Sequence, residues 1–223
     1  MAQQMRERRQ RILEATRELI GERGFGGVTM RDLAHRSRVS VPTLYNQFGS
    51  KDALLAMAVG EHLRGTLGGG EQPAGTGYER VLAILRGIGR EMTRLPEYHR
   101  ALIRAFMSTR GTASLQAGLT GQLSQVLEGA LDEMARDGEL MAWASPRVLA
   151  QRLTAACVAA ATTWALGQLD DAALCAALAY GPSLLLLAVA RGKARDALER
   201  TAREAQPALE DPAPTLLHLQ TGS

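Results

Sequence analysis

Apolar side chains recur along this chain with the three- and four-residue spacing of helices, and nowhere with the alternation of strands. Between residues 9 and 22, for example, a single apolar stripe is formed by Ile12, Ala15, Leu19 and Ile20. Similar stripes predict further helices over residues 51–67, 78–95, 96–106, 115–134 and 146–166, and a last one from about 170 to 203 that passes a kink at Pro182. The pattern therefore predicts an all-α fold.

Two short helices between the first and fourth are marked by capping residues. Thr29 is followed three residues later by Asp32, which is the spacing of a capping box at the start of a helix. Ser40 precedes a second short helix over residues 41–47, and Pro42 stands in its first turn, where a missing N–H does no harm. We expect the Ser40 hydroxyl to accept a hydrogen bond from the N–H of Thr43.

Glycine and proline divide the chain into regions. A Gly/Pro-rich connector over residues 68–77 is the predicted linker between a domain at 1–67 and a larger one at 78–205. Residues 206–223 contain three prolines and are expected to form a loose tail.

Residues 29–48 have the length and layout of a helix-turn-helix, with a tight turn at Arg38 and Val39. For the two helices to pack, the inner positions must be buried: Leu33, Ala34, Val39, Leu44 and Phe48. The second helix would then turn a polar face outward, thin enough to enter a DNA major groove. That face consists of Val41, Pro42, Thr43, Tyr45, Asn46 and Gln47.

Charge is distributed unevenly. Residues 1–67 carry 11 Lys and Arg against 7 Asp and Glu, whereas residues 68–223 carry 15 against 16. The asymmetry suits an N-terminal surface for a polyanion, although a charged, solvated first helix would give the same balance. Helix N-termini at Thr29 and Ser50 suit phosphates, and Lys51 and several arginines stand near them in sequence: Arg31, Arg36 and Arg38.

Other function classes find little support. Cys157 and Cys175 lie in apolar stretches and are expected to be buried, reduced thiols, not a disulfide or a metal site. Residues 172–190 carry no charge, but Gly181 and Pro182 interrupt them, which favours buried helices over a membrane span. With no Gly-rich phosphate loop, nucleophile elbow or metal-ligand spacing, we expect no enzymatic activity and no cofactor.

Residues 11–55 contain a series of short motifs: Arg-Ile-Leu-x-Ala at 11–15, Glu-Arg-Gly-Phe at 22–25, Thr-Met-Arg-Asp-Leu-Ala at 29–34, Val-Ser at 39–40, Thr-Leu-Tyr at 43–45 with Phe48, and Ser-Lys-Asp-Ala-Leu at 50–54. In their order and spacing these motifs resemble the DNA-binding domain of the tetracycline-repressor (TetR) family of bacterial regulators. The resemblance implies DNA contacts from Thr29, Ser40, Thr43, Tyr45 and Lys51. It also implies a three-helix helix-turn-helix domain followed by a helical domain for effector binding and dimerisation.

This sequence departs from the family pattern in two places. Arg38 stands where the family usually has Gly, so the turn is either strained or differently folded. Asn46 and Gln47 replace the common His or Tyr, so the operator sequence is not inherited from relatives. A rival interpretation is an interaction module that has lost DNA binding.

By this resemblance we expect a cytoplasmic regulator of transcription. It would be a repressor that binds a palindromic operator in double-stranded DNA as a homodimer, is released by a small apolar effector and does not bind a membrane. The predicted effector pocket is lined by Met92, Leu95, His99, Phe106, Met107, Leu123 and Trp164. Helices that are apolar or small on all sides suggest a dimer interface, for which we name Leu153, Cys157, Ala160, Leu185 and Val189.

Overall fold

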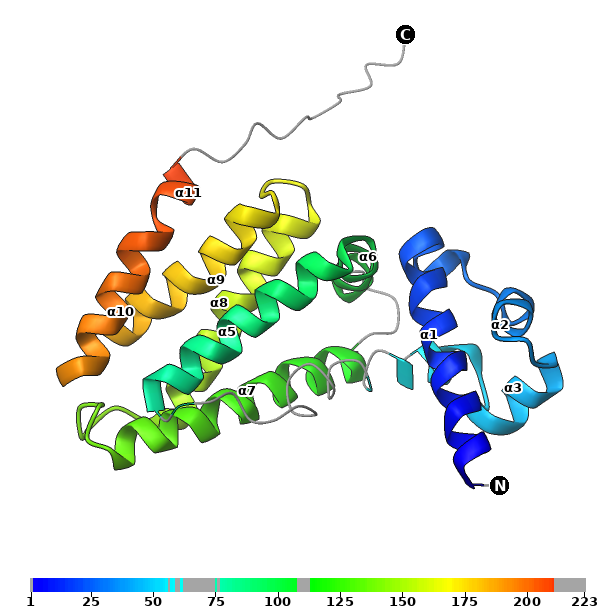
Figure 1. Cartoon of the computed structure of the whole chain (residues 1–223), viewed down its shortest axis with the longest axis horizontal. Helices are drawn as coiled ribbons and strands as arrows, with labels where there is room; N and C mark the ends of the chain where they lie inside the picture. The colour runs from blue at the N-terminus through cyan, green and yellow to red at the C-terminus, as the bar shows by residue number, and fades with distance from the viewer. Residues whose placement is uncertain are drawn as a thin grey trace, which may run out of the picture. The chain divides into compact units, whose positions relative to one another are not determined.

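The computed structural model describes residues 2–55, 57–58, 61, 75, 77–107 and 113–210. Within these ranges the regular elements are helices, and the one β-type pairing is an isolated antiparallel bridge between Leu140 and Ala190 (Figure 1). The all-α prediction is therefore confirmed. The chain divides into two compact units, residues 1–73 with 91–126, and residues 74–90 with 127–223.

The first unit is built around α1 (Ala2–Gly27), α2 (Met30–Ser37) and α3 (Val41–Phe48), followed by helical residues at 51–55 and 57–58. Their apolar stripes meet in one core that includes Ile12, Leu13, Ile20 and Leu54. Four of the five positions expected to be inside the helix-turn-helix are buried there: Leu33, Ala34, Leu44 and Phe48. Val39, the fifth, is partly buried against the same core.

A helix from far along the sequence completes this core. Tyr98 and Leu102, on α6 (Pro96–Met107), belong to the same buried cluster as the helix-turn-helix. The close approach depends on Gly21 of α1, where an added Cβ would lie 3.2 Å from the backbone nitrogen of Tyr98. The first compact unit thus extends beyond residues 1–67, and the domain limits drawn from the sequence stay a prediction.

The second unit contains residues 77–90 of α5 (Gly77–Arg94) and the C-terminal part of α7 (Ala113–Arg136). It also contains α8 (Pro146–Ala165), α9 (Asp171–Leu187), α10 (Gly192–Ala205) and α11 (Pro207–Glu210). The caps of α8 and α9 are formed by Ser145 and Asp170, whose side chains accept from backbone N–H groups. α8 and α9 pack on each other, as do α9 and α10 (Figure 1). Fully buried Trp164 donates from Nε1 to Asp171, 2.8 Å away, which ties the end of α8 to the start of α9.

The predicted single helix from about residue 170 to 203 is wrong, because α9 ends at Leu187 and α10 begins at Gly192. The backbone between them pairs with the segment after α7: Met141 N–H donates to the Val189 carbonyl over 2.9 Å. Gly192 then has φ +55°, which glycine adopts without strain. Pro182, the expected kink, stands inside α9.

Other expectations are only partly met. The first helix is longer than predicted, although the non-helical backbone at Gly24 lies where the glycines were expected to stop it. Cys157 is buried as expected, but Cys175 is exposed, so that expectation was wrong. Most of the predicted linker at 68–77, residues 62–67 of the predicted fourth helix and residues 211–223 of the tail lie outside the described residues.

Nowhere in the described ranges is there a helix long and apolar enough to cross a membrane. This covers α9, which carries most of the uncharged stretch at 172–190.

We predict that Leu102→Ala lowers the free energy of unfolding of the first unit by about 2–5 kcal/mol, because it removes a buried side chain from a packed core. Urea unfolding followed by circular dichroism measures this change. Arg200→Ala, at an exposed position on α10, is the control and should change stability by less than about 0.5 kcal/mol. An equally small effect of Leu102→Ala would show that α6 is not part of this core.

Candidate nucleic-acid interface

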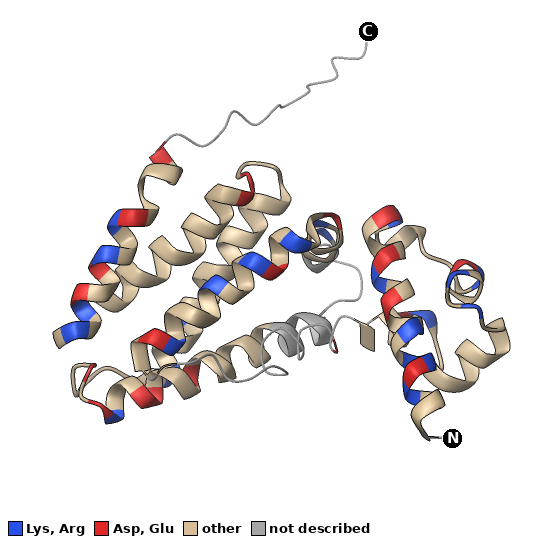
Figure 2. Ribbon diagram, in the orientation of Figure 1, with Lys and Arg blue, Asp and Glu red and all other residues tan. Residues whose placement is uncertain are grey.

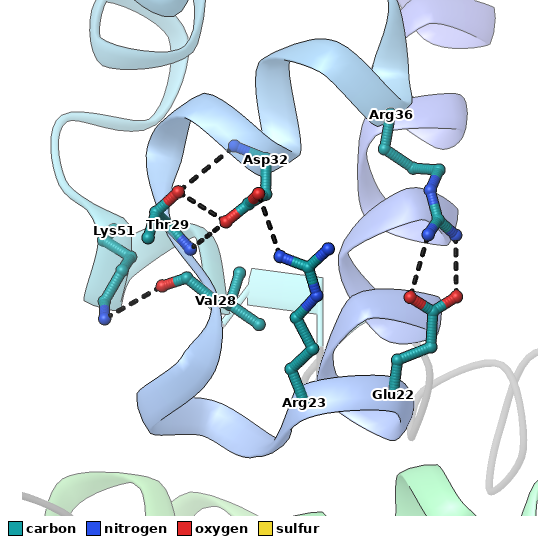
Figure 3. A network of polar contacts seen from close by, with 7 residues as sticks. All are labelled: Glu22, Arg23, Val28, Thr29, Asp32, Arg36 and Lys51. Carbon is teal, nitrogen blue, oxygen red and sulfur yellow. Dashed lines mark hydrogen bonds and ion pairs between the residues drawn. The ribbon is translucent and has the colours of Figure 1, made fainter.

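The start of α2 is fixed by a reciprocal capping box. The Thr29 hydroxyl oxygen accepts from the Asp32 N–H at 3.2 Å, and the Asp32 carboxylate accepts from the Thr29 N–H at 3.2 Å (Figure 3). Arg23 pairs with Asp32 at 2.9 Å. Hydrogen bonds from Thr29, and then from Arg23, lower the pKa of Asp32 below its usual value. The predicted box is confirmed, and it orients the helix that supports α3.

The turn between α2 and α3 is closed by a residue in a left-handed conformation. Arg38 has φ 55° and ψ 47°, the one positive φ at a non-glycine residue in the described part of the chain. The Val39 N–H donates to the Ala34 carbonyl at 3.0 Å, so the turn keeps the hydrogen bonds of a helix C-terminus. Of the two alternatives left by the sequence, the strained turn is the one observed, since a Cβ disfavours this conformation.

α3 presents a polar outer face. Ser40 caps it by accepting from the Thr43 N–H at 3.2 Å, as predicted. Leu44 and Phe48 are buried beneath the helix, so the side chains on its other side point away from the core. Tyr45 is 50% exposed, Pro42, Asn46 and Gln47 are exposed, and Val41 and Thr43 are partly buried.

Lys51 begins the helical segment at residues 51–55, and its side chain reaches the start of α2. Its ammonium group donates to the Val28 carbonyl at 3.2 Å, immediately before Thr29 (Figure 3). Ser50 caps the segment that follows, accepting from the Ala53 N–H at 3.1 Å. One ammonium group therefore lies where the free N–H groups of α2 begin, and such positions suit an anion.

Three arginines were expected near this surface, and they differ in the structure. Arg36 bonds to Glu22 at 2.8 Å and to Glu18 at 3.1 Å, which holds it against α1 and lowers the pKa of Glu22 (Figure 3). Arg31 and Arg38 are exposed, and no ion pair is recorded for either within the described residues. Arg36 thus stabilises the fold, while the other two are available to an external anion.

The residues predicted to line an effector pocket are divided between the two compact units. Met92 and His99 are buried, Leu95 and Leu123 are half-buried, and Met107 is 39% exposed. The side chain of Phe106 lies outside the described residues, and Trp164 belongs to the core of the second unit. Burial lowers the pKa of His99, whose Nδ1 lies 3.0 Å from the Leu95 carbonyl.

The described residues include a groove and a smaller hollow. A groove of about 670 Å³ lies between α1 and the start of α6, and it includes Leu95 but no other predicted pocket residue. A smaller hollow of about 300 Å³ is lined by α5, α9, α10 and α11 and includes none of them. The predicted pocket therefore stays a prediction.

Three residues named for a dimer interface, Leu153, Cys157 and Val189, are buried within the chain itself. Their side chains fill its own core, while Ala160 is half-buried and Leu185 is 41% exposed. Sequence reasoning missed other large apolar side chains at the surface of the second unit: Trp143, Val148 and Leu166. A signal was present, because Val148, Ala155, Ala159 and Leu166 follow one another at intervals of seven, four and seven along α8 and its C-cap.

Sequence comparison matches this arrangement to known proteins. The family described as "Bacterial regulatory proteins, tetR family" matches residues 12–58, a range that includes α2, α3 and Lys51. The repressor KstR of Rhodococcus jostii (strain RHA1) is 39% identical over 119 residues, which are 53% of this chain and 56% of that protein. KstR of Mycolicibacterium smegmatis is 34% identical over 137 residues, 60% of this chain and 66% of that protein.

Residues 12–58 are thus a TetR-family region. The matched part covers 56% and 66% of the length of these two KstR proteins. The match therefore does not show that this chain has the whole activity of either protein.

Solved structures share the fold of this chain. A putative TetR-family regulator from Rhodococcus sp. superposes with a TM-score of 0.65 at 22% identity, covering 81% of this chain and 99% of that one. FadR from Bacillus subtilis, solved in complex with stearoyl-CoA, gives a TM-score of 0.64 at 19% identity, covering 81% and 97%.

The strained turn yields a prediction. Arg38→Gly should be more stable than Arg38→Ala by about 1 kcal/mol, because both variants lose the charge but only glycine adopts the observed φ freely. Thermal and urea unfolding of the two variants measure the difference. Equal stability would show that this backbone is not strained in solution.

Proposed function

We propose that this protein is a sequence-specific DNA-binding regulator of transcription that acts as a repressor. It binds a palindromic operator as a homodimer and is released by a small apolar effector. The observation that carries the proposal is the exposed polar face of α3, which is held by a buried core beneath it and flanked by cations.

The dimensions and chemistry of α3 suit a major groove. With its side chains an α-helix is about 10–12 Å across, which fits a groove about 12 Å wide, and the eight residues of α3 keep the helix short. Amide side chains such as Asn46 and Gln47 can donate and accept at once, which is the pattern that adenine presents. Lys51 and Arg31 suit phosphates, which supply affinity and fix register without reading sequence.

A second copy of the chain is the proposed partner of α8 and α9. Val148, Ala155 and Ala159 form an exposed stripe along α8. On α9, Leu184 and Leu185 are 44% and 41% exposed. Burial of these surfaces in a two-fold interface would hold two α3 helices about 34 Å apart, one turn of DNA. Ala160 and Leu185 of the original expectation remain candidates for this interface.

Relatives and structural neighbours support the proposed effector and compartment. KstR is named as a repressor, and the FadR structure contains stearoyl-CoA, a ligand with a long apolar chain. An effector would act only through a difference in affinity between the DNA-binding and released states. This role needs no catalysis by the protein and places it with DNA in the cytoplasm.

We predict that Tyr45→Phe combined with Lys51→Ala weakens binding to every duplex. Loss of Lys51 from both protomers removes two cations from the interface, which should reduce the slope of log affinity against log salt by about 1.8. Fluorescence anisotropy with labelled duplexes at several salt concentrations measures both quantities, and an unchanged affinity would remove these residues from the interface.

Asn46→Ala is the matched comparison, since it changes an exposed residue on the same helix without changing charge. It should leave the salt slope intact and alter the preferred sequence, because an amide that reads bases affects specificity more than general affinity. An unaltered preference would mean that Asn46 does not read bases.

For the dimer, Leu185→Glu and Ala160→Glu should each produce monomers in sedimentation experiments, because a carboxylate would have to be desolvated in an apolar interface. Arg200→Glu, at an exposed position on α10, should leave the dimer intact. Persistence of the dimer in both α8 and α9 variants would place the interface elsewhere.

A further inference from the structure

The first turns of α1 extend beyond the core of their unit. Residues 3–8 are all exposed, and the first fully buried side chain of the helix is Ile12. Met5 stands seven residues before Ile12, on the face that packs inward further along, yet it is 66% exposed. These turns therefore gain little from burial within the chain.

The first turns of α1 carry positive charge, which lies toward the positive end of the helix dipole. Residues 6–11 contain four arginines and one glutamate, and the first turn holds no acidic residue (Figure 2). Positive charge near a helix N-terminus is unfavourable, and most so in the first turn. No ion pair is recorded for Arg6 or Arg8 within the described residues. Among the residues that the structure describes, no compensating charge is thus recorded for these two.

The contacts of Arg9 show what lies beside the first turns of α1. Its guanidinium bonds to Glu61 at 2.7 Å and lies 5.8 Å from the centre of the Phe48 ring. Phe48 is the last residue of α3, so Arg9 lies beside the C-terminal end of the helix proposed to read DNA. At 100° per residue, Arg6 and Arg8 flank the line from Met5 to Arg9 on its two sides.

We propose that Arg6 and Arg8 bind phosphates of the same duplex, next to the groove that α3 occupies. This inference rests on the proposed DNA-binding function and adds to it a second contact, at the opposite end of α3 from the Ser40 cap. Guanidinium groups pair well with phosphate oxygens, and the contact supplies affinity without reading sequence. The phosphates also supply the negative charge that the start of α1 lacks.

The test compares Arg6→Gln/Arg8→Gln with the unaltered chain and with Arg191→Gln/Arg200→Gln, an equal loss of charge at exposed positions of the second unit. Affinity for one duplex is measured by anisotropy between 50 and 200 mM salt. Two lost contacts in each protomer are four per dimer, which reduce the salt slope by about 3.6, so the affinity lost across this range should be about 150-fold smaller in the Arg6/Arg8 variant. The second-unit variant should keep the slope of the unaltered chain.

Arg6→Lys/Arg8→Lys should restore the slope, because a phosphate contact of this kind requires only the charge. The preferred sequence from a random duplex pool should be the same for all variants. An unchanged slope in the Arg6/Arg8 variant, while the unaltered chain binds DNA, would overturn the inference and leave the proposed function standing. A changed sequence preference would also overturn it, and failure of the unaltered chain to bind any duplex would overturn both.

Discussion

The burial of Leu44 and Phe48 beneath α3 is the contact on which the rest of the first unit depends, because it decides which side of α3 faces outward. Because those two side chains face the core, the polar residues on the other side of the helix lie at the surface. The capping box at Thr29 and the left-handed turn at Arg38 set the angle at which α2 supports this arrangement. Each is a local device, and each serves the orientation of one short helix. The packing of the neighbouring core therefore offsets the conformational strain of a side chain at φ 55°.

Local signals explain what could be predicted from the sequence. Caps, turns and the buried side of a short helix depend on residues a few positions apart, and Thr29, Ser40 and Leu44 behave as their spacing indicated. Long-range contacts were not accessible in this way. The joining of α6 to the first core depends on the fit of Gly21 against Tyr98, which no periodicity encodes. The break between α9 and α10 likewise depends on pairing with residues near Met141.

In the second unit, the hydrophobic pattern does not predict which side chains are buried within the chain. Its α8 and α9 helices are apolar on nearly all sides, so the pattern cannot say which face packs within the chain. The structure assigns Leu153 and Cys157 to the inside and leaves Val148, Leu166 and Leu184 exposed. In the same way, the sequence could not reveal that Arg36 is held by Glu22 while Arg31 remains available. Charge counts give the sign of a surface, and only the fold shows which charges are already paired.

Selection from a random pool of duplex DNA with the purified protein tests the central claim most directly. The account predicts enrichment of one inverted repeat, with half-sites about one helical turn apart, because two copies of α3 would each read one half-site. Failure to enrich any sequence, from a protein shown to be folded and dimeric, would contradict it.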